Sequence, residues 1–266
     1  MNAKSVKGYP LENSAWKQYN RLDLRERTVT IRAVTFDFWR TLYRDTRSKE
    51  RHRARIEALV EIGGVDPTRA KTAMKHTMEE FLRIHVYEQR TLQPADAIAI
   101  LEVFLAEPLD PAVHDALSTA FAQAIDEHPP EPIDNALEAV CRTAEILPVG
   151  LISDTGISPG YALYRILVRV GISELFQVKT FSDRVGVAKP QAAMYETTAA
   201  ALGCAASDLL HIGDLEPTDI AGALNVGARA ALFAGDNTRF ADSTRAHHTF
   251  HSWKSYLDQM DTLLNG

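Results

Sequence analysis

Residues that could act on an anionic substrate stand at the ends of successive apolar segments of the chain. Asp37 and Ser153 each close a short strand-like run, and Asp214 follows another. Lys189 stands directly before a proline at the start of an expected helix, and Asp219 lies about one turn beyond Asp214. A carboxylate, a hydroxyl, an ammonium group and an acidic pair therefore occur in that order along the sequence.

These side chains form a coherent chemical set if they lie close together. Carboxylates within a few ångströms repel one another unless a cation lies between them, and oxygen ligands suit Mg²⁺. Lys189 would add a second positive charge, and Ser153 with nearby backbone N–H groups would bind substrate oxygens. A phosphate monoester approaches a carboxylate nucleophile only when such charges neutralise it. The residues therefore favour a phosphoryl group, on a small phosphorylated metabolite, as the target.

The elements that must position these residues alternate between strands and helices after residue 132. We expect strands over 33–36, 148–152, 176–180, 209–212 and 228–233, and helices over 135–145, 161–170, 190–202, 219–226 and 251–264. This alternation is typical of an α/β protein with a parallel sheet and helices on both faces. Ligands bind beyond the carboxyl ends of such strands, so the loops that carry the candidate residues should converge on one crevice.

A helical insert separates the first expected strand from the others. We expect helices over 48–62 and 66–88, with Ser48 as the cap of the first, and two more that start at Pro94 and at Asp110. Three prolines between 129 and 132 form a stiff break where the chain returns to the main domain. The sequence thus predicts an N-terminal extension (1–30), a core (31–46 and 132–266) and a helical cap (47–131).

Four stretches of the sequence resemble the haloacid dehalogenase superfamily of aspartate-nucleophile hydrolases. The run Asp37-Phe38-Trp39-Arg40-Thr41-Leu42 resembles the nucleophile loop, and Leu151-Ile152-Ser153 resembles the strand that ends in a substrate-binding Ser or Thr. Lys189-Pro190 is similar to the lysine site of the family. His211-Ile212-Gly213-Asp214, followed by Asp219 and Gly222-Ala223, resembles the metal loop, which is the most specific of the four motifs. The match runs from Ile31 to about Phe233.

The resemblance implies a Rossmann-like core with a helical cap inserted after the first motif. It implies that Asp37 is the nucleophile and that Ser153 and Lys189 bind the transferring group. Mg²⁺ is the implied cofactor, and its implied ligands are Asp37, the carbonyl group of Trp39 and Asp214, with Asp219 as a supporting carboxylate. Thr41 is implied to brace the nucleophile loop.

The nucleophile loop departs from the family pattern at two positions. Family phosphatases usually carry a second Asp, the general acid and base, where this chain has Trp39. Losing a general acid typically forfeits about 10²–10⁴ in rate. The substrate could have a good leaving group, the cap could supply an acid, or the chemistry could differ. Arg40 replaces the usual Gly, which is tolerable if that turn is helical rather than at positive φ.

Two further classes of function therefore stay open beside the phosphatase. The first is dehalogenase-like or phosphonatase-like hydrolysis; the retained Asp214 argues against a dehalogenase, and a phosphonatase would need a cap lysine such as Lys49, Lys71 or Lys75. The second is a binding protein that kept the fold without catalysis. Trp39 is either an aromatic wall for the substrate or a packing residue under the cap. The cap histidines that could supply a proton are expected at exposed positions (His52, His76 and His85).

The composition of the 266 residues, 45% hydrophobic and 24% charged, is that of a globular protein. The net charge of −6 argues against a nucleic-acid partner. Lys and Arg gather between Arg40 and Arg55, where we expect a solvated helix face. Cys141 and Cys204 lack metal-ligand spacing and are expected to be buried. The absence of a signal-like N-terminus and of a long apolar run makes a cytoplasmic location the expectation, without a membrane span. Nothing in the pattern indicates an oligomeric state.

Overall fold

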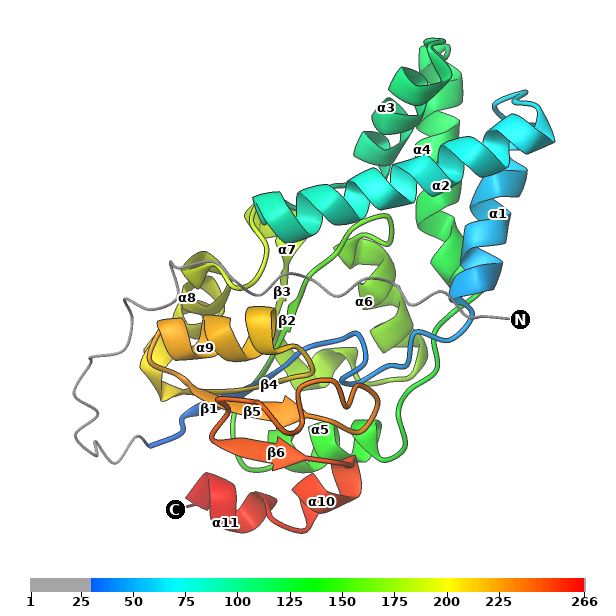
Figure 1. Ribbon diagram of the computed structural model, residues 1–266. Helices are drawn as coiled ribbons and strands as arrows, with labels where there is room; N and C mark the ends of the chain where they lie inside the picture. Colours follow the sequence, from blue (N-terminus) through cyan, green and yellow to red (C-terminus); the bar gives the residue numbers. More distant parts are fainter. Residues whose placement is uncertain (1–29, 266) are drawn as a thin grey trace.

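The computed structural model describes residues 30–265, apart from the side chains of residues 86, 87 and 265. A six-stranded sheet is flanked by helices, and a separate group of helices, α1–α4, projects from one end of it (Figure 1). This arrangement confirms the α/β, Rossmann-like fold class. The predicted extension, residues 1–30, falls outside the described residues except for Thr30. The domain boundaries after residues 46 and 131 stay predictions.

The sheet is parallel throughout and has the order β3-β2-β1-β4-β5-β6. Its strands are β1 (Ala33–Phe36), β2 (Val149–Ser153), β3 (Phe176–Phe181), β4 (Leu209–Gly213), β5 (Arg229–Phe233) and β6 (His248–Phe250). From β1 the chain adds β2 and β3 on one side, and it then returns to add β4, β5 and β6 on the other. The reversal lies between β1 and β4, and the carboxyl ends of strands at such a switch point form the usual ligand crevice.

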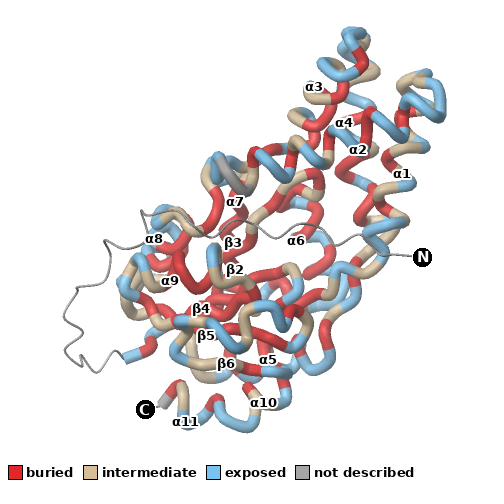
Figure 2. Tube along the Cα trace, in the orientation of Figure 1, coloured by how far each residue is buried: buried red, intermediate tan, exposed pale blue. Residues whose placement is uncertain are grey.

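Both faces of the sheet are buried because alternate residues of each strand point to opposite sides. Val34 and Phe36 of β1 belong to an apolar cluster with helices α5 (Ala136–Ala144), α6 (Gly160–Arg169) and α10 (Trp253–Leu257). Ala33 belongs to the cluster on the other face, with α8 (Ala192–Ala201) and α9 (Ala221–Asn225). In Figure 2 the central strands β1, β2 and β4 are accordingly red, whereas the outer strands β3 and β6 are only partly so. A sheet held from both faces gives the loops at its carboxyl edge a fixed base.

The projecting helices have an apolar core of their own, which includes Leu59, Met74, Leu101 and Phe121. They are α1 (Ser48–Glu61), α2 (Pro67–Arg83), the π-helical turn η2 (Ile84–Glu88), α3 (Pro94–Leu105) and α4 (Pro111–Glu127). Asp66 caps α2 by accepting hydrogen bonds from the backbone N–H groups of Thr68 and Arg69. We refer to these helices as the helical bundle.

Three expectations about local structure were wrong. Ser48 is the first residue of α1 and not its cap; the cap position belongs to Arg47, whose side chain makes no capping hydrogen bond. The helix expected over 190–202 begins only at Ala192. The single helix expected over 251–264 is split into α10 and α11 (Met260–Asn265), and it is preceded by β6. A strand of three residues is too short to show alternation in the sequence.

The remaining elements are short. They are the 3₁₀ turns η3 (Ser173–Leu175) and η4 (Ala206–Asp208), the helix α7 (Ser182–Val185) and the π-helical turn η5 (Glu216–Ile220). Within residues 30–265, every helix is too short or too polar to cross a membrane.

Candidate active site

Asp37 is the first residue after β1 and lies at the switch point of the sheet. Its backbone N–H donates to the carbonyl group of Ile212 in β4 at 2.9 Å. One carboxylate oxygen, Oδ1, accepts a hydrogen bond from Lys189 Nζ at 2.5 Å, and Oδ2 accepts one from the Thr41 hydroxyl at 3.3 Å. Thr41 therefore braces Asp37, as the resemblance implies. Asp37 is only 4% exposed, and each of its carboxylate oxygens is oriented by one of these donors.

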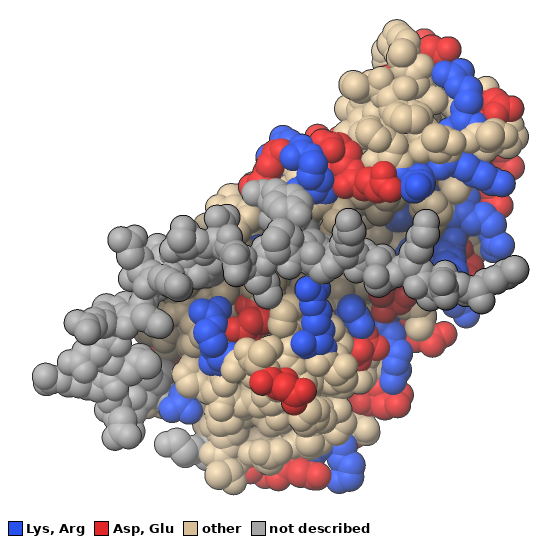
Figure 3. Space-filling view, viewed as in Figure 1, with Lys and Arg blue, Asp and Glu red and all other residues tan. Residues whose placement is uncertain are grey.

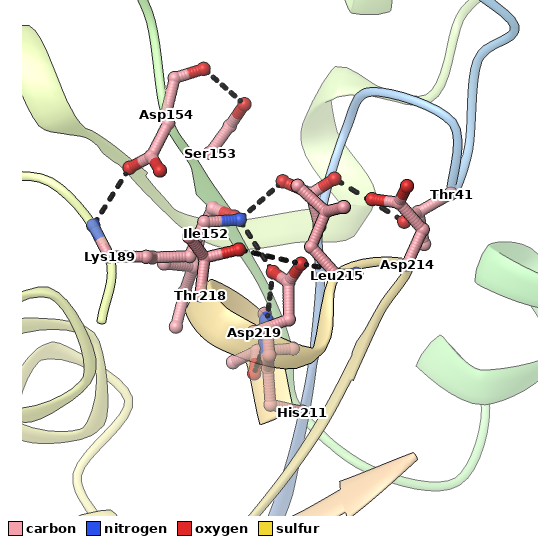
Figure 4. A network of polar contacts seen from close by, with 12 residues as sticks. Thr41, Ile152, Ser153, Asp154, Lys189, His211, Asp214, Leu215, Thr218 and Asp219 are labelled. Atoms are coloured by element: carbon pink, nitrogen blue, oxygen red, sulfur yellow. Dashed lines mark hydrogen bonds and ion pairs between the residues drawn. The ribbon is translucent and has the colours of Figure 1, made fainter. Parts of the chain in front are cut away.

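Lys189 lies at the centre of the buried polar group drawn in Figure 4. Besides Asp37, its Nζ donates to Asp219 Oδ1 at 2.6 Å and to the carbonyl group of Ile152 at 3.3 Å. Its backbone N–H donates to Asp154 Oδ1 at 2.9 Å. Burial alone would lower the pKa of Lys189, but the carboxylates of Asp219 and Asp37 raise it well above its usual value. The lysine is therefore a permanent cation.

Asp219 is held by His211 of β4, which is held in turn by Thr35 of β1. His211 Nε2 lies 3.0 Å from Asp219 Oδ1, and the Thr35 hydroxyl lies 2.9 Å from His211 Nδ1. Burial lowers the pKa of His211, so the ring is neutral and one nitrogen donates while the other accepts. Donation from Nε2 to Asp219 leaves Nδ1 to accept from Thr35. Burial would raise the pKa of Asp219, but Lys189 and His211 together hold it below its usual value.

Asp214 follows β4 and completes a group of three carboxylates. Its Oδ2 accepts a hydrogen bond from Asn237 Nδ2 at 2.7 Å. One oxygen from each of Asp37, Asp214 and Asp219 lies within 4.8 Å of the others. Burial, with Asp219 close by, raises the pKa of Asp214 to about 7, and burial also raises the pKa of Asp37.

The charges in this group do not balance. If all three carboxylates are ionised, they face one ammonium group and two negative charges have no partner among the side chains of the group; the raised pKa values of Asp37 and Asp214 agree with this excess. Oxygen ligands that together carry this charge fit a hard divalent cation. Asp219 already has four donors in Lys189, His211, the backbone N–H of Leu215 and the Thr218 hydroxyl, so Asp37 and Asp214 have more lone pairs free for an ion.

Ser153 is the last residue of β2, and Trp39 lies two residues after Asp37 in the loop after β1. Ser153 is fully buried at the end of β2, and its hydroxyl donates to the carbonyl group of Asp154 at 3.1 Å. Trp39 is half-buried, its ring packs edge-on against Phe38 at 5.1 Å between centroids, and the Arg51 guanidinium lies 5.6 Å from the ring centroid. The roles implied for Ser153, and for the Trp39 carbonyl group as a metal ligand, stay predictions.

The turn at Arg40 is at positive φ, so the condition under which Arg would be readily tolerated there is not met. Arg40 has φ of 58°, the left-handed region that favours Gly. For a residue with a Cβ this conformation costs about 1–2 kcal/mol. The side chain compensates through an ion pair in which Nε donates to Asp236 Oδ2 at 2.9 Å.

The charged face expected between Arg40 and Arg55 is also only partly solvated. Arg51 and Arg55, one turn apart on α1, are 3% and 7% exposed. Among the histidines of the helical bundle, His76 is exposed as expected, whereas His52 and His85 are half-buried. His85 Nε2 lies 3.9 Å from Asp154 Oδ2. Cys141 and Cys204 are half-buried rather than fully buried.

Sequence reasoning missed several residues that hold the site together. His211 could have been noticed, because it is the one polar side chain in the apolar run of β4. Asn237 lies in a loop after β5, where an amide has no distinguishing pattern. Arg51 and Arg55 look like an ordinary solvated face, because the helical spacing of charges does not reveal what packs against them.

Comparison with known proteins places this geometry in a family. A family model described as haloacid dehalogenase-like hydrolase matches residues 31–227. The comparison with curated proteins returned no match. Among solved structures, a 2-haloacid dehalogenase from Pseudomonas syringae pv. Tomato DC3000 has a TM-score of 0.67 and 19% identity, over 88% of this chain and 100% of that one.

Two other solved structures have a similar fold. A HAD phosphatase from Thermococcus onnurineus has a TM-score of 0.63 and 16% identity, with 89% of this chain and 99% of that chain covered. The magnesium-bound HAD-hydrolase YfnB from Bacillus subtilis has a TM-score of 0.60 and 15% identity, with 89% and 100% covered. Because the family model spans most of the chain, this protein belongs to the haloacid dehalogenase-like hydrolases.

Proposed function

We propose that this protein hydrolyses phosphate monoesters of small metabolites, with Mg²⁺ as cofactor and Asp37 as nucleophile. The observation that carries the proposal is the buried group of three acids, Asp37, Asp214 and Asp219. One carboxylate oxygen of each lies within 4.8 Å of the others, and Lys189 is bonded to Asp37 and Asp219. Carbon–halogen displacement needs no such collection of acids. A phosphate monoester, which carries close to two negative charges, needs both a cation and the lysine before a carboxylate can approach it.

Asp37 and Asp214 are the residues that would hold Mg²⁺, with the Trp39 carbonyl group as a further ligand and Asp219 in support. The bound ion would supply positive charge that offsets the charge of the phosphoryl oxygens. Lys189 would supply the second positive charge from its position 2.5 Å from Asp37. The Ser153 hydroxyl, by turning from the Asp154 carbonyl group, would bind a phosphoryl oxygen.

The reaction then takes two steps on Asp37. A carboxylate oxygen of Asp37 attacks phosphorus, and the bond from phosphorus to the ester oxygen breaks. The leaving alkoxide takes its proton from water, because the Trp39 side chain offers no carboxylic acid. Water then attacks the phosphorus of the aspartyl-phosphate and breaks its bond to Asp37, which releases phosphate and restores the carboxylate. This sequence favours esters of acidic alcohols, which are good leaving groups.

Dehalogenation is the second candidate, because Trp39 places an apolar ring where a phosphatase would carry its acid. It predicts halide release from a 2-haloacid in the absence of Mg²⁺. Phosphonatase chemistry has less support, since Lys49, Lys71 and Lys75 are all exposed.

The test is turnover of para-nitrophenyl phosphate, whose leaving group needs no general acid. We expect hydrolysis that depends on Mg²⁺ and falls by at least about 10³-fold in Asp37→Asn. Asp115→Asn, which changes an exposed carboxylate on α4, is the matched control and should keep full activity. Activity that survives in Asp37→Asn would remove Asp37 from the proposed role, and halide release without phosphatase activity would favour the second candidate.

A further inference from the structure

A cavity of about 370 Å³ lies between the helical bundle and the loops that follow β1 and β2. Small-molecule sites are commonly of this size. The cavity is lined by the same loops that carry two of the candidate residues, since Trp39 lies two residues after Asp37 and Gly156 lies three residues after Ser153. The residues that line it are Trp39, Arg40, Asp45, Ser48, Arg51, His52, Arg55, Met78, Phe81, Gly156, Ile157 and Ser158.

The cavity is positively charged in a chain whose net charge is −6. Its lining holds three arginines and one aspartate. Arg40 pairs with Asp236, and Arg51 pairs with Asp45 while it also donates to two backbone carbonyl groups. Figure 3 shows that basic side chains elsewhere on the visible face of the bundle lie beside acidic ones. Positive charge that faces a cavity is therefore a local property of this site.

Arg55 differs from the other two arginines. It is 7% exposed, its Nε donates to the carbonyl group of Phe121 at 3.1 Å, and its Nη2 donates to the Ser158 hydroxyl at 3.3 Å. Both of these partners are neutral, and among residues 30–265 no carboxylate lies within ion-pair distance of it. Burial, and secondly Arg51, lower the pKa of Arg55 to about 10, so it stays charged at neutral pH. The charge of Asp45 also acts on Arg55, but Asp45 is paired with Arg51, so an anionic ligand would offset the remaining cost of burying this cation.

The other walls of the cavity suit the carbon skeleton of a small molecule. Apolar surface comes from Trp39 in the loop after β1, from Met78 and Phe81 on α2, and from Ile157 in the loop after β2. Ser158, which belongs to the loop after β2, links Arg55 to the core through their hydrogen bond. A ligand with one end at Asp37 could therefore cross an apolar surface and place its other end at Arg55.

We propose that Arg55 binds a second anionic group, a carboxylate or a phosphate, at the far end of the substrate. The substrate class is thus a small phosphate monoester with a second anion on the other side of its carbon skeleton. The identity of the reacting end rests on the proposed function, whereas the binding of the distal anion does not. A guanidinium group binds a carboxylate and a phosphate with the same bidentate geometry, so both belong to the proposal.

The test compares aryl phosphates that differ only in the charge of the distal group. 4-Carboxyphenyl phosphate and 4-phosphonophenyl phosphate carry the anion, and 4-carbamoylphenyl phosphate is a neutral compound of nearly the same shape. We expect the wild-type protein to prefer at least one anionic compound by about 10- to 100-fold in kcat/KM, the range for a charge-assisted hydrogen bond. The compound that shows the preference identifies the distal group as carboxylate or phosphate.

Arg55→Gln should remove this preference while turnover of the neutral compound continues. Arg55→Lys, which keeps the charge without the forked geometry, should keep only part of it. Arg53→Gln, an exposed arginine on the same helix, should behave like the wild type. The proposal is overturned if the wild type shows no preference, or if Arg55→Gln keeps it. Should Arg55→Gln fail to fold, an unchanged preference in Arg55→Lys overturns the proposal as well.

A binding measurement separates this proposal from the proposed function. Calorimetry with 4-carboxybenzylphosphonate and its neutral carbamoyl analogue needs no turnover. If no aryl phosphate is hydrolysed, the proposed function fails, yet tighter binding of the carboxylate compound that depends on Arg55 still supports the distal site. If hydrolysis occurs without a preference for either anionic ester and both phosphonates bind alike, the distal site fails and the proposed function stands.

Discussion

At the scale of single residues, the charged side chains of the site share their hydrogen-bond partners. Lys189 is shared between Asp37 and Asp219, and Asp219 is shared between Lys189 and His211. The second oxygen of Asp37 accepts from Thr41, and that of Asp219 accepts from the backbone N–H of Leu215, so both carboxylates are held in a fixed orientation. Trp39, two residues after Asp37, differs from these residues because its side chain contributes packing and no acid group.

Replacing Trp39 with Asp should restore a proton donor for the leaving group. Under the proposed function, we expect Trp39→Asp to raise kcat/KM for alkyl phosphates by about tenfold or more relative to para-nitrophenyl phosphate, the lower part of the range for general acids. Trp39→Asn loses the same ring without gaining an acid and is the control. An equal effect of the two changes would show that lost packing around Phe38 and Arg51, rather than acid catalysis, decides the outcome.

At the scale of elements, the carboxyl ends of β1 and β4 position the three acids. Gly213, the last residue of β4, makes this possible because a Cβ there would lie 2.2 Å from Asp219 Cγ. The absence of a side chain lets the turn η5 bring Asp219 back against the strand end. Asp219 could not occupy this position if residue 213 carried a side chain.

Gly213→Ala should therefore displace Asp219 and loosen Lys189. A misplacement of about 1 Å can cost about 10²-fold in rate, and we expect kcat to fall by that much or more. Gly160→Ala is the matched control, because its Cβ would lie 2.4 Å from the Phe181 ring, away from the acids. Both changes overpack the interior and should lower the free energy of unfolding by about 1–3 kcal/mol. Loss of activity in both folded variants, or in neither, would contradict the role of Gly213.

At the scale of the whole molecule, the proposed Mg²⁺ site would link ion binding to the stability of the fold. The three acids come from loops on both sides of the sheet reversal, so they are brought together only in the folded chain. The raised pKa values of Asp37 and Asp214 reflect repulsion and burial that a bound cation would relieve. An ion that binds only the folded state stabilises it by mass action.

Mg²⁺ should raise the thermal unfolding midpoint of the protein. At 100 times its dissociation constant, the ion adds about 2.7 kcal/mol, which for a chain of this size corresponds to roughly 5–10 °C. Asp214→Asn should abolish most of this rise, and its midpoint without Mg²⁺ should lie above that of the wild type because one buried charge is removed. Circular dichroism at matched ionic strength measures both effects. An equal rise in the variant would exclude Asp214 as a ligand.

The sequence by itself was enough to predict the parallel sheet, the helices of the bundle and the position of the acids at strand ends. Those features depend on local periodicity and on the rule that parallel strands present their carboxyl ends at one edge. The structure brings four of these residues into one group, although they lie as far apart in the sequence as positions 37 and 219. They are Asp37, Lys189, Asp214 and Asp219.

Only the tertiary structure decided which charged residues are buried and what they contact. Arg51 and Arg55 have the spacing of a solvated face, but the loops after β1 and β2 cover them and leave a cavity beside Arg55. The pair formed by Thr35 and His211, 176 residues apart, follows from the register of β1 against β4. Burial depends on what packs opposite a side chain, and that partner comes from a distant part of the chain which no local pattern identifies.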